Sequence, residues 1–187
     1  MSYGKRVDAE GKAISADNEK KGPVAGEKVK GVKITSFDWA EVQGSKSDTL
    51  AKVGFTQANG STVYMPIFEP KESTFSSKEK QEADLQRNIL HIATKCMPEE
   101  QYYAELGEPE TFQDFINKAK AIIMKHSEGK TFTMKFIYGK KGYVEVPKFP
   151  NFIALSGVDE DKLITTKYDK YTFEATPTAP VAQDDVF

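Results

Sequence analysis

The stretch that decides the fold is residues 50–68, which read LAKVGFTQANGSTVYMPIF. Apolar and polar residues alternate in Leu50–Ala58 and again in Ser61–Phe68, which is the period of strands with one buried face. Asn59 and Gly60 lie between the two arms, and this pair favours the positive φ angles of a two-residue hairpin turn. The stretch therefore predicts two neighbouring antiparallel strands.

The same alternation extends upstream of the hairpin, where residues 24–39 predict a long first strand. Val32 marks the face that we assign to the core. Strict alternation then places Lys33, Phe37 and Trp39 together on the opposite, outer face.

After the hairpin the period changes to that of a helix. Ser76 and Glu79 form a capping-box pattern, and Pro98 ends the apolar periodicity that follows it. A second apolar stripe begins near Thr111. Residues 76–126 are therefore predicted to be a helical insert of two helices, whose apolar stripes are most simply packing surfaces.

Strand periodicity returns at residues 131–138, and residues 143–146 leave the tight loop 139–142 as a fifth strand. Residues 156–173 are less regular, and aromatic residues near their end indicate one more extended segment docked on the body. Five strands with helices between the third and fourth is the order of the OB-fold, a five-stranded, partly open Greek-key barrel. We expect this mainly β fold over residues 23–173, although another small β-barrel with a helical cap has nearly the same pattern.

Composition narrows the functional classes. Hydrophobic residues make up 39% and charged residues 29% of the 187 residues, which is typical of a globular domain, and no apolar run approaches the ~20 residues that span a bilayer. The single cysteine, Cys96, excludes a disulfide framework, and with only His91 and His126 a zinc cage is disfavoured. We expect a cytoplasmic protein that is not an enzyme and has no cofactor or metal. A magnesium-dependent nuclease built from scattered carboxylates is a further alternative.

The two ends of the chain are polar. Residues 1–22 have hardly any apolar residue and no signal-peptide core, and residues 174–187 carry three acidic residues without a Lys or Arg. Both segments are expected to be flexible. Residues 130–148, by contrast, hold five lysines against one carboxylate. This layout is typical of a protein with an anionic partner that an acidic tail can mimic.

Single-stranded nucleic acid requires positive charge along the phosphates and exposed rings on which bases stack. The outer faces of the first three strands and the loop between the last two strands carry both kinds of residue. The candidate DNA-binding residues are Lys33, Phe37, Trp39, Lys52, Tyr64, Phe68, Lys135, Lys140, Lys141 and Tyr143. The alternative is that the helical insert covers these rings and that the loop lysines only keep a turn soluble.

The chain ends on Asp184, Asp185, Val186 and Phe187, an acidic pair followed by two apolar residues. This end resembles the C-terminal tip of bacterial single-stranded DNA-binding proteins, in which several aspartates precede Ile-Pro-Phe, and the acidic, Phe-terminated tails of phage counterparts. Val186 stands where those proteins have the Ile-Pro pair, and the acidic run is shorter here. The resemblance implies that this tip docks on replication or recombination proteins, such as a polymerase, helicase or primase, and competes with DNA.

Together these features predict a phage-type single-stranded DNA-binding protein that coats and protects single-stranded DNA in replication, recombination and repair. We expect it in the host bacterial cytoplasm, without a membrane partner, and a homo-oligomer is compatible with the sequence. The alternative is a non-enzymatic protein-interaction or virion-structural β-barrel module, whose aromatic face meets another protein.

Overall fold

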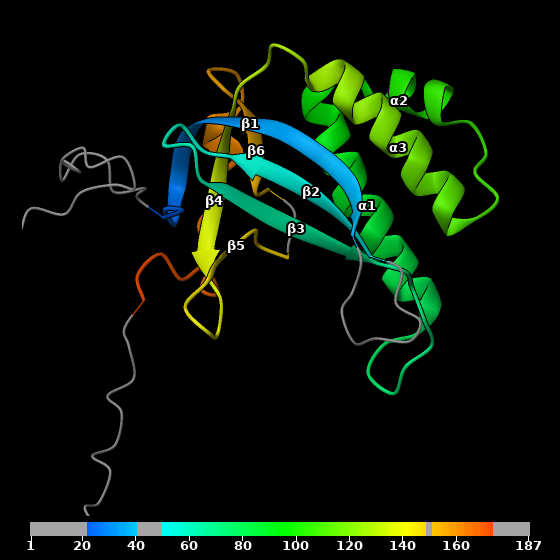
Figure 1. Cartoon of the computed structure of the whole chain (residues 1–187), viewed down its shortest axis with the longest axis horizontal. Helices are drawn as coiled ribbons and strands as arrows, with labels where there is room; N and C mark the ends of the chain where they lie inside the picture. The colour runs from blue at the N-terminus through cyan, green and yellow to red at the C-terminus, as the bar shows by residue number, and fades with distance from the viewer. Residues whose placement is uncertain (1–21, 41–49, 149–150, 174–187) are drawn as a thin grey trace, which may run out of the picture.

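The computed structural model describes residues 22–40, 50–148 and 151–173. The predicted flexible segments 1–22 and 174–187 therefore lie, except for Gly22, outside the described residues. The elements are β1 Gly26–Ala40, β2 Leu50–Thr56, β3 Thr62–Phe68, α1 Lys78–Cys96, α2 Glu99–Leu106, α3 Phe112–Ser127, β4 Phe132–Tyr138, β5 Val144–Glu145, β6 Ile153–Leu155 and the 3-10 helix η2 Glu160–Lys162 (Figure 1). Among the described residues, no helix combines the length and apolar character needed to cross a membrane.

The strands form one antiparallel sheet in the order β3-β2-β1-β4-β5, with β6 also paired to β4. β1 serves both halves of the sheet, because it pairs with β4 between Gly26 and Val32 and with β2 from Lys33 onward. The predicted mainly β fold with a helical insert between the third and fourth strands is confirmed. The sheet is open, since no pairing between β3 and β5 closes it within the described residues.

The β2–β3 hairpin is confirmed, with Thr56 opposite Thr62 at its closed end. Its connection is longer than the predicted two-residue turn. The Gln57 amide donates to the Ser61 carbonyl at 2.9 Å, and in this loop only Gly60 has a positive φ, +83°. This hydrogen bond encloses a loop of three residues, 58–60, of the kind that ends on a left-handed glycine.

A β-bulge in β1 corrects the predicted faces of its second half. The register with β2 shifts between Ile34 and Ser36, so that one extra residue enters β1 and reverses the alternation beyond it. Phe37, only 1% exposed, consequently joins Val32 in the core, and Trp39 packs against the same core. The prediction that Phe37 and Trp39 lie on the outer face is wrong, because strict alternation takes no account of an inserted residue.

Three helices, rather than two, make up the described insert. Ser77, one residue after the predicted cap, accepts a hydrogen bond from the Lys80 amide, whereas Thr111 caps α3 as predicted by accepting one from the Asp114 amide at 3.1 Å. The sequence pattern does not predict α2, because Pro98 ends the apolar periodicity; proline is nevertheless well tolerated at the start of a helix, and α2 begins directly after it. The helices gather on one side of β1–β3 (Figure 1), and their apolar faces complete the core on this inner face of the sheet.

Residues 156–173, which we call the strap, cover β4 on the side away from the core. Hydrogen bonds along β4 hold the strap there, among them Thr133 Oγ1 to Glu160 Oε1 (2.8 Å), Lys135 Nζ to Asp169 Oδ2 (2.7 Å) and the Tyr138 amide to the Lys170 carbonyl (2.7 Å). The docked segment predicted in this region is thus present, as turns and η2 instead of an extended strand.

Candidate nucleic-acid interface

The outer face of β2 and β3 carries large apolar side chains that remain exposed. Tyr64 and Phe68 are 47% and 56% exposed, and Lys52 Nζ lies 4.5 Å from the centroid of the Tyr64 ring. The register accounts for this grouping, because Lys52 is opposite Pro66, which lies between the two rings on alternate positions of β3. We call Lys52, Tyr64, Pro66 and Phe68 the outer strip.

Gly54 makes room for the Tyr64 ring. It lies opposite Tyr64, and a Cβ at this position would stand 2.4 Å from the Ser36 hydroxyl oxygen and 3.1 Å from Tyr64 Cε1. A larger residue would therefore push the ring away from its place beside Lys52. The geometry of the outer strip depends on a small residue that offers no binding group of its own.

A groove of about 430 Å³ continues the outer strip around the edge of β3. Its mainly apolar walls come from β3, α1 and residues 145–148, where Lys148 is exposed. Two carboxylates also line it, Glu145 and Asp84, the second of which is paired with an arginine on α1. The side-chain oxygen of Asn88, on the α1 wall, is buried without a hydrogen-bond partner in the described structure. The groove thus combines apolar surface with one cation, Lys148, and two carboxylates, one of which is already paired with an arginine.

The β4–β5 hairpin loop presents the lysines that the sequence placed there. Lys140 and Lys141 are exposed, and Tyr143 is 74% exposed. The loop is tight, because the Gly142 amide donates to the Gly139 carbonyl at 3.0 Å and Gly142 adopts a φ of +78°. The predicted location at a hairpin tip is confirmed, and the loop leads through β5 into the wall of the groove.

Lys33 lies at the opposite end of these strands from Phe68. It is exposed and opposite Thr56 in the β1–β2 register. Between it and the rings, the hydroxyls of Thr35, Thr56 and Thr62 form a chain with successive O–O distances of 2.8 Å. A polar row of threonines therefore separates Lys33 from the aromatic part of the face.

Two of the predicted stacking residues and one predicted lysine do not reach the outer face. Phe37 is in the core, and the Trp39 ring lies edge-on to Phe112 of α3, with ring centroids 5.9 Å apart. The Trp39 indole also donates to Asn117 of α3 at 2.9 Å, which fixes the ring on the inner side. Lys135 is 2% exposed, because the strap covers the second face of β4. These three placements correct the sequence-based assignment.

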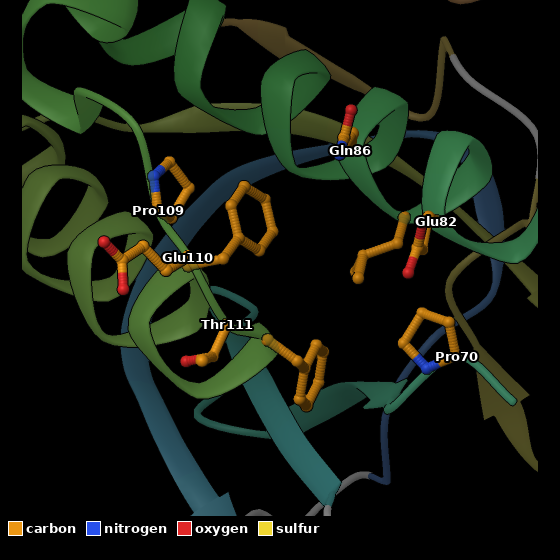
Figure 2. Close-up of a pocket in the computed structure, with 9 residues that line it drawn as sticks. Pro70, Glu82, Gln86, Pro109, Glu110 and Thr111 are labelled. Carbon is orange, nitrogen blue, oxygen red and sulfur yellow. The ribbon is translucent and has the colours of Figure 1, made fainter. Parts of the chain in front are cut away.

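A smaller cavity of about 220 Å³ lies between α1 and the start of α3. Figure 2 shows Glu82 and Pro70 on one side of it and Pro109, Glu110 and Thr111 on the other. Two carboxylates, Glu82 and Glu110, line this cavity without a lysine or arginine, so it has no cation to attract phosphate. We therefore do not include this cavity in the interface.

Burial favours the uncharged forms of two α1 side chains, His91 and Cys96, at neutral pH. Burial, aided by the charge of Lys95, lowers the pKa of His91 to about 4, and its Nε2 accepts a hydrogen bond from the Asn151 amide at 3.0 Å. Burial raises the pKa of the Cys96 thiol to about 11. Over the part of the chain that the structure describes, no three His, Cys, Asp or Glu side chains are grouped to hold a metal ion.

Two residues of the groove were missed by sequence reasoning. Asn88 lies within a helical pattern that was read as packing, and Lys148 was counted only within the lysine-rich stretch 130–148. No local signal connects either residue with β3. Only the packing of α1 and of the chain after β5 against the edge of β3 brings them to the outer strip.

No family model matches this sequence, and searches of curated proteins and of solved structures found no match. The assignment of function therefore rests on the chemistry of the site.

Proposed function

We propose that this protein binds single-stranded DNA and does not act on it as an enzyme. The observation that carries the proposal is the outer strip, where two exposed rings and a lysine share one face beside an apolar groove. Apolar surface gathered in this way is characteristic of an interaction site. A base stacked on an aromatic ring contributes about 1–3 kcal/mol, and lysines attract the phosphates between bases.

The strip favours single strands over duplex. Bases stack on Tyr64 and Phe68 only when they are unpaired and free to leave the helical stack. In this proposal Lys52, Lys148 and the hairpin lysines bind phosphates of the same strand. Asn88, Tyr64 and Phe68 line the same groove, so a base stacked on the rings lies beside an amide side chain.

We also propose that the open sheet is a variant of the OB-fold. Support comes from the β1–β2–β3 meander, from the long bulged β1 shared by both halves of the sheet, and from the helices between β3 and β4. OB-folds bind oligonucleotides on strands 2 and 3 and with the loop between strands 4 and 5. The outer strip and the β4–β5 hairpin are the corresponding places in this chain.

In this proposal the protein coats and protects single-stranded DNA during phage replication, recombination or repair in the bacterial cytoplasm. Asp184, Asp185, Val186 and Phe187 lie outside the described residues, and their resemblance to the tips of single-stranded DNA-binding proteins supports a role in recruiting a polymerase, helicase or primase. A short acidic and aromatic anchor on a tether makes weak contacts that exchange readily.

The test measures the fluorescence anisotropy of labelled oligo-dT, with a duplex of the same length as competitor. Tyr64→Ala combined with Phe68→Ala should weaken binding by roughly 5-fold or more for each ring. Tyr103→Ala is the matched control, because Tyr103 is 51% exposed but lies on α2. Trp39 fluorescence is expected to report folding instead of stacking, since its ring packs on α3.

The alternatives give different results in the same preparation. Wild-type protein that binds no oligonucleotide at low salt refutes the proposal. Sedimentation would then show whether the protein forms an oligomer, and hydrogen exchange whether that oligomer buries the outer strip. Both results together would favour the protein-interaction or virion module. Degradation of the oligonucleotide on adding Mg²⁺ or Mn²⁺ would instead indicate a nuclease.

A further inference from the structure

The strap places cations and aromatic rings at the same end of β4 as the hairpin loop (Figure 1). Lys167 and Lys170 are exposed, and Tyr168 and Phe173 are 62% and 50% exposed. Lys167 Nζ lies 5.1 Å from the centroid of the Tyr168 ring. We call these four residues the strap patch. Its pairing of a cation with an exposed ring repeats that of Lys52 and Tyr64 on the outer strip.

The strap patch has a fixed position on the body. Lys135 of β4 is 2% exposed, and its ammonium donates to Asp169 at 2.7 Å and to the Ile164 carbonyl at 2.8 Å. The Tyr138 amide donates to the Lys170 carbonyl. The strap is therefore anchored at Ile164, before Lys167 and Tyr168, and at Asp169 and Lys170, after them. The rings and lysines are therefore presented from a docked backbone.

The strap patch and the hairpin loop form one continuous surface. The Phe173 ring covers Gly142 so closely that a Cβ there would be 2.8 Å from the ring, and it also contacts Tyr138, with centroids 5.9 Å apart. Lys140 and Lys141 are thus joined to the strap patch through Phe173. The positive and aromatic area extends from the hairpin along the strap.

The lysines of this surface are not ion-paired within the described residues, although the Glu145 carboxylate packs against Gly139 of the hairpin. Lys140, Lys141, Lys167 and Lys170 form no ion pair with a described residue. Asp169, the carboxylate between the strap lysines, is turned inward and paired with Lys135. The four ammonium groups therefore face solvent beside exposed rings.

We infer that the strap patch is a second contact surface for single-stranded DNA, which lengthens the path from the outer strip past the hairpin loop. This inference rests on the proposed function. Phosphates alternate with bases along a strand, and Lys167, Tyr168, Lys170 and Phe173 supply cations and rings in alternation. An acidic polypeptide would satisfy the lysines but would leave the two rings without stacking partners.

The experiment compares labelled oligo-dT of about 8 nucleotides, within the ~4–16 nucleotides that one small single-strand-binding domain covers, with oligo-dT of about 30 nucleotides, which exceeds that range. Lys167→Glu with Lys170→Glu should lower affinity for the long oligonucleotide more than for the short one. Loss of two phosphate contacts should also reduce the slope of log K against log salt by about 1.4. Tyr168→Ala should weaken long-oligonucleotide binding by roughly 5-fold or more.

Lys118→Glu with Lys125→Glu is the control for charge reversal elsewhere, because these lysines, with side chains 38% and 68% exposed, lie on α3 in the helical layer. Trp39 fluorescence confirms that each variant is folded. Wild-type protein that binds neither oligonucleotide refutes the proposed function itself. If the wild type binds and the strap variants have affinities within about twofold of it, with an unchanged salt slope, only the strap inference is overturned. Selective loss of binding to a poly-glutamate probe, with DNA binding intact, would also overturn it and assign the surface to an acidic polypeptide.

Discussion

Lys135→Met tests whether a buried charge pair holds the strap on β4. The side chains of Lys135 and Asp169 are 2% and 5% exposed, and Lys135 also donates to the Ile164 carbonyl. The variant removes the cation and leaves the Asp169 carboxylate buried without an ionic partner. Breaking a buried pair in this way costs about 3–5 kcal/mol. We expect the lower end of this range, because Asp169 keeps the hydrogen bonds from the Thr166 amide and the Tyr171 hydroxyl.

The assay is unfolding in urea and by heat, followed by circular dichroism. A loss of about 3 kcal/mol in the free energy of unfolding corresponds to a fall in Tm of about 6–12 °C for a domain of this size. Lys140→Met, at the exposed hairpin tip, should change the free energy by no more than about 0.5 kcal/mol.

Asp169→Leu added to Lys135→Met should recover part of the loss, since an apolar pair replaces the stranded carboxylate. Although burial raises the pKa of Asp169, the bonds from Lys135 and the Thr166 amide hold it below its usual value. Without Lys135 this pKa should rise, so the stability gap between wild type and Lys135→Met should shrink at acidic pH. A single variant within about 1 kcal/mol of wild type, or a double variant no more stable than the single, would refute the role of the pair.

Three further predictions concern the core, the outer strip and pH. Phe37→Ala should destabilise the protein by about 3–5 kcal/mol in urea, because it empties a fully buried site; a loss below 1 kcal/mol would contradict the bulge-shifted register. Gly54→Val should lower both stability and oligonucleotide affinity, since its Cβ meets the Ser36 hydroxyl at 2.4 Å; normal affinity would show that the position of the Tyr64 ring is unimportant. Burial keeps the pKa of His91 at about 4 in the folded protein, against 6.5 when unfolded, so the unfolded chain binds more protons between these values and stability falls as pH decreases. Between pH 7 and pH 5 the free energy of unfolding should fall by about 2 kcal/mol less in His91→Gln than in the wild type. Equal falls in the two proteins would exclude His91 as the source of this pH dependence.

The β2–β3 hairpin and its exposed residues were predictable because strand periodicity is local. Alternation alone places Lys52, Tyr64 and Phe68 on the face opposite Val63 and Ile67, and the structure keeps them there. The hairpin lysines were predictable for a similar reason, since a loop between two strands is exposed wherever the strands lie. The same rule failed for Phe37, because a bulge inserts a residue without a signal in the local pattern.

The sequence by itself determined the order of β1, β2, β3, α1, α3, β4 and β5, the apolar stripes of α1 and α3, and the side chains that the hairpin exposes. These properties depend on neighbours within a few positions of the chain. The tertiary structure alone decided that α3 covers Trp39, that the strap encloses Lys135 and that Asn88 and Lys148 meet the edge of β3. Such contacts join residues distant in the chain, and they depend on how whole faces pack together, which no local pattern of residues encodes.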